Sequence, residues 1–368
     1  MKGHDVVIVG GGPAGTAAAL TLARYSSLET TLLERGDFSE IRIGETIGPG
    51  ANSLLKYLGV GDQVLDGAHR AALSVAAAWG SQEIFTQEFL FSGRGEGWQL
   101  DRNLFDAMLA AAARKAGTTV HTKTIVRNVA SKKDGRWQLA LESFDGAPAT
   151  LTARFLIDAS GRTAIVARGL GSEPAPVDRL VGVVGYLGFD GKSREDGAST
   201  LVESVPQGWW YSTWLPGGNL AVALMSDADL LRPIAAQSIS GWTRLLSEAP
   251  LTRKRVVGGL RPPRLYTRPA SSHLLCPAGG EGWLSAGDAL SAFDPLSSMG
   301  VGHALASGAS AGRAAEASLR GDIAPTLEYT ANSTRHFTEF LEIRSRFYAM
   351  EKRWPDMPFW QRRHRRND

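Results

Sequence analysis

A glycine-rich turn near the N-terminus constrains this chain more than any other feature. An apolar, β-prone run over residues 5–9 leads into the sequence GGGPAG at residues 10–15, and a helix-prone segment follows. This order predicts a strand, a tight turn and a helix. In such a unit Gly10 permits the turn, Gly12 lets the backbone approach a diphosphate, and Gly15 lets the helix pack on the strand. Because the helix N-terminus adds amide donors and a positive dipole end, the turn is typical of a dinucleotide site.

An acidic residue stands where a dinucleotide fold requires one. Residues 30–33 predict a second strand, and Glu34 follows at its carboxyl end, roughly 20 residues past the glycines. A carboxylate there would accept hydrogen bonds from ribose hydroxyls. Strand, helix and acid in this order favour a nucleotide site over a glycine loop that binds nothing.

Composition limits the remaining possibilities. The 368 residues, 43% of them apolar and 21% charged, predict a globular chain of two joined regions. A net charge of +3 gives no reason to expect nucleic acid as a partner. The single cysteine, Cys276, fits a reducing compartment, so we expect a cytoplasmic location. No apolar run reaches membrane-spanning length, and no group of histidines or cysteines has metal-ligand spacing, so no metal is expected.

Two further segments resemble strand ends that line a ligand crevice. The first runs over residues 154–162 and closes in Asp158-Ala159-Ser160-Gly161. The second runs over residues 282–289 and closes in Gly287-Asp288, before a small-residue helix over residues 303–319. The carboxyl ends of parallel strands meet at one edge of a sheet, so both turns are expected at the nucleotide site.

Two loop-and-helix segments complete the pattern. The sequence IGETIGPG over residues 43–50 precedes a helix predicted at residues 51–58. The sequence GWQLDR over residues 97–102 precedes a stronger helix, residues 103–116, with apolar residues at helical spacing. Arg102 stands at the start of that helix, where a positive charge serves solvent or a phosphate better than the helix dipole.

In this order, these motifs resemble the family of FAD-dependent aromatic hydroxylases, tryptophan halogenases and geranylgeranyl-type reductases. The resemblance implies FAD as cofactor and an α/β fold, in which a Rossmann-like FAD domain of the glutathione-reductase type carries an inserted, mainly antiparallel β-sheet substrate domain and a C-terminal helical segment. The expected cofactor-binding residues are Gly10, Gly12, Pro13, Ala14, Gly15, Glu34, Arg35, Gly44, Arg102, Val126, Asp158, Gly161, Gly287, Asp288, Pro295, Ser298, Gly300 and Val301. The expected regions are 1–75, 101–175 and 271–325 for FAD, 76–100 and 176–270 for the substrate sheet, and 326–368 for a helical, basic tail.

A narrower resemblance joins the chain to the LodB, GoxB and QhpG group. It depends on Gly44-Glu45-Thr46, the segments AWGS at 78–81 and GWQLDR at 97–102, FDPLSSMG at 293–300, and the terminal RWPDMPFW at 353–360. Members of that group oxygenate tryptophan in a partner polypeptide while a quinone cofactor is built. The resemblance places residues 295–301 beside the flavin ring, where amides at a helix N-terminus would stabilise negative charge.

The middle of the chain predicts a sheet that roofs the flavin. Candidate strands lie at residues 181–189, 200–205 and 220–225. Four aromatic residues cluster within residues 208–216, a concentration that suits a flat apolar substrate wall, although core packing explains any one of them equally well. The expected substrate-pocket residues are Trp79, Trp209, Trp210, Tyr211 and Trp214.

The resemblance also separates two reactions. Halogenases carry a lysine some way beyond their Gly-Glu-Ser/Ala segment, but this chain has no lysine between Lys56 and Lys115, and Trp79 lies where that lysine is expected. Hydroxylation through a flavin C4a-hydroperoxide is therefore favoured, with O₂ as co-substrate. Glu45 and Asp294 are the preferred candidates for a catalytic base, ahead of His69, His121 and His303.

The source of electrons and the role of the tail stay open. The chain carries one dinucleotide fingerprint, so no separate NAD(P)H domain is expected. Either NAD(P)H binds transiently, or a separate reductase partner reduces the flavin. The tail is expected to dock on the body, or else on a partner protein. A halogenase, a double-bond reductase and an FAD-binding maturation chaperone remain the alternatives to a monooxygenase acting on an aromatic substrate such as a peptide tryptophan.

Overall fold

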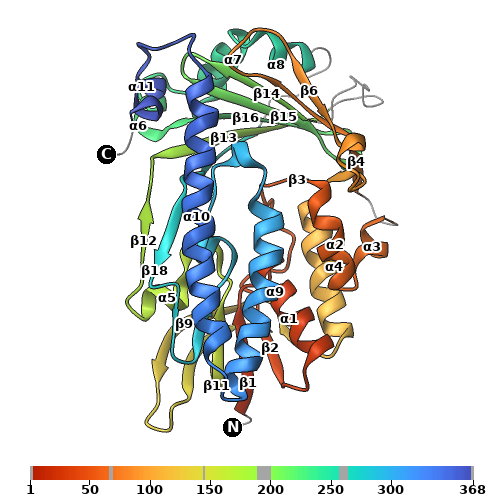
Figure 1. Ribbon diagram of the computed structural model, residues 1–368, viewed down its shortest axis with the longest axis vertical. Helices are drawn as coiled ribbons and strands as arrows, with labels where there is room; N and C mark the ends of the chain where they lie inside the picture. The colour runs from red at the N-terminus through yellow and green to blue at the C-terminus, as the bar shows by residue number, and fades with distance from the viewer. Residues whose placement is uncertain (1–2, 66–68, 144–145, 189–199, 257–263, 366–368) are drawn as a thin grey trace.

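The computed structural model describes residues 3–65, 69–143, 146–188, 200–256 and 264–365. The chain forms two parts stacked along its longest axis, a parallel sheet with helices below and a large antiparallel sheet above (Figure 1). The long helix α10 (Ala324–Met350) runs beside both parts and leads to the C-terminus. The predicted fold class, an α/β FAD domain with a β-sheet domain and C-terminal helices, is confirmed.

The parallel sheet has the strand order β8-β2-β1-β11-β20. Its central strand β1 is buried from Val6 to Val9 because both faces are covered there, as is usual for parallel sheets. Val6 and Ile8 pack on the helix side, and Val7 packs toward a layer from β9 and β10. The bounds are β1 (Gly3–Val9), β2 (Thr30–Leu33), β8 (Thr119–His121), β9 (Thr124–Ser131), β10 (Trp137–Ser143), β11 (Pro148–Asp158), β19 (Gly279–Gly280) and β20 (Trp283–Ser285).

Two helices bring their N-termini together at one edge of this sheet. Helix α1 (Pro13–Tyr25) packs along α9 (Gly300–Leu319), and a side chain at Gly308 of α9 would collide with the backbone carbonyl of Ala14. The close approach requires a residue without Cβ, and it places the starts of both helices beside the glycine turn. The other helices of this part are α2 (Asn52–Tyr57), α3 (Gly61–Leu65), α4 (Arg102–Lys115) and α5 (Ile165–Gly169).

The upper sheet has the order β17-β13-β16-β15-β14-β5-β6 and is antiparallel except for the β14–β5 pair. One face carries a core under α7 and α8, and the other faces the FAD domain. The bounds are β5 (Ser74–Ala78), β6 (Phe85–Glu88), β13 (Leu180–Leu187), β14 (Thr200–Val205), β15 (Gly208–Trp214), β16 (Leu220–Asp227), β17 (Arg264–Pro269), α6 (Ala228–Leu231), α7 (Ile239–Ser247) and α8 (Pro250–Arg255). The three predicted strands correspond to β13, β14 and β16; Phe189, at the end of the first, lies outside the described residues.

Short strands join the two parts. One small sheet has the order β3-β7-β4, with β3 (Thr46–Ile47), β4 (Arg70–Ala72) and β7 (Gly97–Gln99). Another has the order β12-β18-β21, with β12 (Glu173–Pro176), β18 (His273–Cys276) and β21 (Ser291–Ala292). Within the described ranges, no helix is long and apolar enough to cross a membrane.

The C-terminal segment docks on the body rather than extending into solvent as a free tail. Helix α11 (Pro358–His364) buries Phe359 and Trp360, and the Trp360 indole donates to the Val205 carbonyl at 2.9 Å. Arg363 forms a buried, two-bond ion pair with Asp227. Residues 366–368 of the predicted basic tail lie outside the described residues.

Candidate active site

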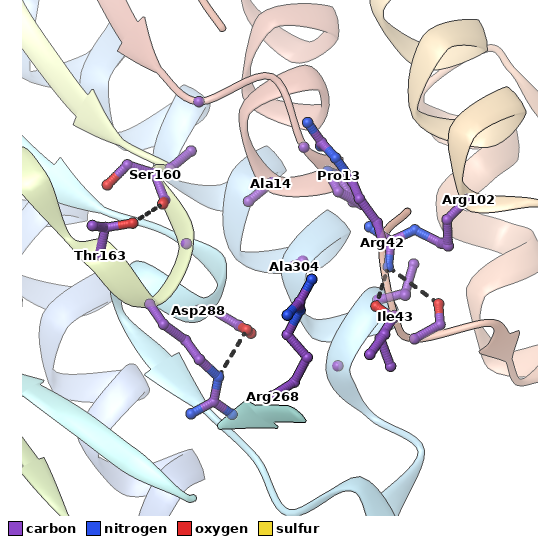
Figure 2. Close-up of a pocket in the computed structure, with 18 of the residues that line it drawn as sticks. Pro13, Ala14, Arg42, Ile43, Arg102, Ser160, Thr163, Arg268, Asp288 and Ala304 are labelled. Carbon is purple, nitrogen blue, oxygen red and sulfur yellow. Dashed lines mark hydrogen bonds and ion pairs between the residues drawn. The ribbon is translucent and has the colours of Figure 1, made fainter. Parts of the chain in front are cut away.

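A cavity of about 730 Å³ lies between the two parts, at the edge where the parallel strands end. This volume falls within the range of sites that bind cofactors and drug-sized ligands. Figure 2 shows Arg42 and Arg102 on one side of the cavity and Ser160 and Thr163 on the other. Arg268 enters from the upper sheet.

The glycine turn forms one end of the cavity, as its spacing predicts. Gly10 has a φ of +109°, and a Cβ there would collide with the Ala159 carbonyl. A Cβ at Gly15 would collide with the Gly10 carbonyl oxygen. Gly12 and Ala14 line the cavity, so the first turn of α1 presents backbone amides that have no partner within the helix.

Glu34 lies beside this turn and is held from three directions. One carboxylate oxygen accepts from the Gly11 amide at 2.6 Å; the other accepts from the Gly36 amide at 2.9 Å and from Arg42 at 3.0 Å. Glu34 is buried and lines the cavity, so its carboxylate is fixed for further hydrogen bonds. Arg42 was missed from the sequence, because it belongs to a loop without a periodic pattern.

Buried Asp106 orients two arginines at the cavity wall. It accepts from Arg42 at 2.9 Å and from Arg102 through both carboxylate oxygens at 3.2 and 3.1 Å. Arg102 also donates to the carbonyls of Ile43 and Gly44, at 2.9 and 3.2 Å. Arg102 therefore positions the loop before Glu45, which adds to the role expected from the sequence. A carboxylate one helical turn after Arg102 was the sequence signal for this pairing.

The second strand-end turn shapes the opposite wall. Asp158 is fully buried and does not line the cavity; its carboxylate accepts from the Ser160 amide at 3.0 Å and the Ala167 amide at 2.9 Å. It therefore holds the turn whose residues Ser160 and Gly161 do line the cavity. Asp288 also lines the cavity, with its carboxylate 3.6 Å from Arg162.

The start of α9 forms the floor below the upper sheet. Pro295, Ser298, Gly300 and Val301 line the cavity, as the resemblance implies. Ser298 has a φ of +51°, and the helix begins two residues later. A Cβ at Gly300 would meet no atom within 4 Å, so this position faces open space beside the helix N-terminus.

Glu45 is a second buried acid that lines the cavity. It is 4% exposed, and its carboxylate accepts from the Tyr186 hydroxyl at 2.6 Å and from the Gly44 amide at 3.1 Å. Burial raises the pKa of Glu45, against the two hydrogen bonds, which lower it. Burial and the adjacent carboxylate also raise the pKa of Tyr186, so its hydroxyl remains a donor. Tyr186 was missed, because only the register of β13 above the loop reveals it.

A chain of uncharged polar groups continues from the cavity into the upper part. Tyr211 lines the cavity, and its hydroxyl lies 2.8 Å from that of Thr46. The Thr46 hydroxyl donates to Gln99 at 2.7 Å, and the Gln99 amide donates to Thr200 at 2.9 Å. All of these groups find partners, so the chain fixes β3 beneath the sheet.

The second predicted base, Asp294, lies away from the cavity. It is 1% exposed, and one oxygen accepts from Arg344 at 2.9 Å and from the Tyr348 hydroxyl at 2.8 Å. The other oxygen accepts from the Leu296 amide at 3.0 Å and caps the turn that follows. These partners direct Asp294 toward α10, so the structure does not bring it to the cavity with Glu45, and its role as a base stays a prediction.

The predicted tryptophan wall also lies elsewhere. Because side chains alternate along a strand, Trp210 and Trp214 of β15 point into the outer core, where Trp210 packs on Trp242 of α7. Trp209 points the other way but donates to Tyr348 beyond the cavity, in one cluster with Trp79. Of the five expected substrate-pocket residues, only Tyr211 lines the cavity.

The three histidine alternatives do not line the cavity either. His69 packs edge-on against Phe105, and the exposed His121 belongs to β8. His303 lies 3.0 Å from the Ser291 hydroxyl, and burial lowers the pKa of its imidazole to about 3. None of them has the placement that a base acting in this cavity needs.

Most of the predicted cofactor-binding residues line this one cavity, and the others support it. Those that line it are Gly10, Gly12, Pro13, Ala14, Glu34, Arg35, Gly44, Arg102, Val126, Gly161, Asp288, Pro295, Ser298, Gly300 and Val301. Those that do not are Gly15, Asp158 and Gly287; a Cβ at Gly287 would lie 2.7 Å from that of Ala14.

The cavity fits an FAD molecule in its donor set and its shape. The glycine turn and the start of α1 offer amides for a diphosphate, and Glu34 offers a carboxylate for ribose hydroxyls. Arg42 and Arg102 lie on the same side, each ion-paired with Asp106. At the other end, the start of α9 offers amides for the ring system below the upper sheet.

Comparison with known proteins agrees with this fit. Residues 3–199 match the family described as FAD binding domain. LodB of Marinomonas mediterranea, named an FAD-dependent oxidoreductase, is 32% identical over 366 residues, which cover 99% of this chain and 98% of LodB.

Two solved structures share the fold. The myxobacterial chondrochloren halogenase CndH has a TM-score of 0.91 at 23% identity, covering 100% of this chain and 87% of its own. The peptidyl tryptophan dihydroxylase QhpG has a TM-score of 0.78 at 24% identity, covering 100% and 80%. The chain therefore belongs to the FAD-dependent oxidoreductases of the halogenase and hydroxylase family, with FAD as its cofactor.

Proposed function

We propose that this enzyme is a monooxygenase that hydroxylates an aromatic ring, and that the ring is a tryptophan side chain of a partner polypeptide. The observation that carries the proposal is the buried Glu45 carboxylate at the roofed end of the cavity, held by Tyr186 and the Gly44 amide. A carboxyl group with a raised pKa in an enclosed site is suited to taking a proton from a reacting ring.

The residues of the chain divide the work between the two ends of the cavity. Reduced FAD would supply the two electrons for activation of O₂; overall, a hydroxyl group with one oxygen atom of O₂ replaces a ring hydrogen, and the other oxygen atom takes up two protons and leaves as water. Glu45 accepts the proton that the ring loses, and Tyr186 keeps the carboxylate oriented. Gly182, Val184 and Ala270 form an apolar roof that excludes water from the ring.

Halogenation is the main alternative, since the fold is shared with halogenases. The halogenases that this chain resembles need a lysine near the flavin. No lysine lines the cavity among the described residues, and Trp79, at the expected position, donates to the Phe347 carbonyl of α10 instead. The cavity therefore favours hydroxylation. QhpG, named for its action on peptidyl tryptophan, supports a polypeptide substrate.

The test uses the FAD-loaded enzyme reduced by light, so that the natural electron donor need not be known. A tryptophan-containing peptide is added with isotopically labelled O₂ and with chloride and bromide present. We expect the peptide to gain labelled oxygen on its tryptophan, measured by tandem mass spectrometry. Incorporation of halogen, or reoxidation of the flavin with an unchanged peptide, would reject the proposal; the second result would leave a chaperone role.

A further inference from the structure

The edge strand β17 presents three charged or aromatic side chains on one face. Side chains alternate along a strand, so Arg264, Tyr266 and Arg268 point to the same side. Leu265, between them, packs on the outer core of the upper sheet, so the three face the other way, toward the FAD domain. Both arginines are exposed. We name these three residues the β17 clamp.

One end of the clamp, Arg268, lies at the cavity. Its register on β13 places Arg268 opposite Gly182 and Arg264 opposite Tyr186. Arg268 lines the cavity and, in Figure 2, reaches in beside Asp288. The Tyr266 ring lies 6.0 Å from that of Tyr186, whose hydroxyl binds Glu45. The clamp therefore continues outward from the proposed base.

The two arginines are ordered by an aromatic ring and not by an acid. Their guanidinium carbons lie 5.2 and 5.6 Å from the centre of the Tyr266 ring. Such cation–π contacts hold the side chains in place without neutralising them. Neither arginine has an ion pair with any residue of the described ranges, and two acids of the cavity, Glu45 and Asp288, already have Tyr186 and Arg162 as partners. The clamp therefore carries two positive charges that no ion pair with a described residue offsets.

We propose that the β17 clamp binds acidic side chains on either side of the aromatic residue that enters the cavity; this specificity rests on the proposed function. Arg264 and Arg268 are four residues apart on an extended strand, so their anchor points are separated by roughly 13 Å. Each arginine can therefore meet its own carboxylate on an extended polypeptide, because same-side side chains recur about every 7 Å along such a chain and guanidinium groups match carboxylates in geometry.

Direct binding to the oxidised, FAD-loaded enzyme tests the clamp. The probes are short synthetic peptides with one central tryptophan and, two positions away on each side, aspartate, asparagine or lysine. We expect the aspartate peptide to bind most tightly by fluorescence anisotropy. The double variant Arg264→Gln/Arg268→Gln should weaken its binding about tenfold, the product of two exposed ion pairs of roughly threefold each, and leave the asparagine peptide unaffected.

The matched control is Arg313→Gln. Arg313 is also exposed and stacked on a tyrosine, with its guanidinium carbon 5.6 Å from the Tyr57 ring centre, but it does not line the cavity. Its loss should change nothing. Absence of a charge preference, including failure of every peptide to bind, overturns the clamp. So does a double variant that weakens binding of NADPH but not of the aspartate peptide, since the clamp would then serve a dinucleotide.

The binding test and the turnover test fail separately. If the aspartate peptide binds through the arginines but gains no oxygen, the proposed function is wrong and the clamp stands. If all three peptides are oxygenated equally and bind equally, the clamp is wrong and the proposed function stands.

Discussion

The two ends of the cavity are built by different means. At the nucleotide end, backbone does most of the work: the glycine turn, the start of α1 and the amides around Glu34 come from one continuous segment. At the roofed end, side chains from distant segments meet, and Glu45 and Tyr186 are 141 residues apart in sequence. The first end is fixed by local backbone geometry, and the second by the register of a sheet above a loop.

This difference predicts how each end responds to substitution. A backbone-built site fails as a whole when one residue cannot adopt its conformation, since several amides lose their positions together. A site made by side chains loses one function at a time. Cofactor binding should therefore depend mainly on the nucleotide end, and the proposed reaction mainly on the roofed end.

The largest effect is expected for Gly10→Ala. The new Cβ would require a φ of +109° and would collide with the Ala159 carbonyl, so the turn must move. We expect purified protein without bound FAD, measured by flavin absorbance, and a free energy of unfolding lower by about 3 kcal/mol. Gly117→Ala is the matched control, because Gly117 has a φ of +110° but open space around it. A control variant that also lost FAD would show that strain alone, and not the diphosphate turn, explains the result.

The sequence was sufficient at the nucleotide end because its signals are local. Gly10, Gly12 and Glu34 stand at fixed offsets from predicted strands, and the structure places all three around one cavity. Arg42 was not predicted: it belongs to a loop without periodicity, and its contact with buried Asp106 spans 64 residues. Composition and spacing carry no information on such a pair until the helix that holds the acid is placed.

Glu45→Gln should have the next largest effect and should separate the two ends. Glutamine keeps the size of the side chain, so FAD binding should persist while hydroxylation slows by roughly a hundredfold or more, as expected for loss of a general base. The measurement is single-turnover oxygen incorporation beside flavin absorbance. If the variant hydroxylates at the wild-type rate, Glu45 is not the base.

Glu45→Gln also tests how the stability of the folded protein depends on pH. Burial raises the pKa of Glu45 in the folded protein above its ordinary value of 4.5. The folded state therefore holds this proton more tightly, and the resulting stabilisation is present below pH 4.5 and is lost as pH rises through the folded pKa. As pH rises through this range, the melting temperature of the wild type should fall relative to that of Glu45→Gln.

Asp294→Asn should act on stability and not on chemistry. Asp294 is buried between Arg344 and Tyr348, so removing its charge leaves Arg344 without one of its two carboxylate partners. We expect the free energy of unfolding to fall by about 3 kcal/mol in chemical denaturation, with an unaltered pH–rate profile. Glu342→Gln is the matched control on α10, the helix that carries Arg344. It removes only an exposed ion pair with Arg346 and should cost under about 0.5 kcal/mol. A stable Asp294→Asn variant without turnover would restore Asp294 as a catalytic residue.

The sequence was less informative at the roofed end for a physical reason. Its strands were predicted, but the face that each side chain takes depends on register, and a shift of one residue exchanges the two faces. Trp210 and Tyr211 are neighbours, yet one packs on α7 and the other lines the cavity. The aromatic cluster predicted a substrate wall, but most of its side chains pack in hydrophobic cores. The partner of Asp294 was equally hidden, since the Tyr348 hydroxyl that donates to its carboxylate comes 54 residues later.

The smallest effect, and the finest test of the roofed end, is expected for Tyr186→Phe. The Tyr186 hydroxyl donates to Glu45 at 2.6 Å and lowers the pKa of a carboxyl that burial raises. Without this hydrogen bond the pKa of Glu45 rises further, so a base that must be ionised becomes active only at higher pH. We expect the acidic limb of the pH–rate profile to move toward higher pH, with a modest loss of rate on the plateau.

Tyr211→Phe distinguishes this electrostatic effect from a general disturbance of the roof. Tyr211 lines the cavity, but its hydroxyl contacts Thr46 and not Glu45. Its removal should change substrate affinity and leave the acidic limb in place. If both variants move the limb equally, the profile reports the polarity of the cavity as a whole. If neither does, the ionisation that limits the rate belongs to a group other than Glu45, and the division of labour between the two ends would have to be redrawn.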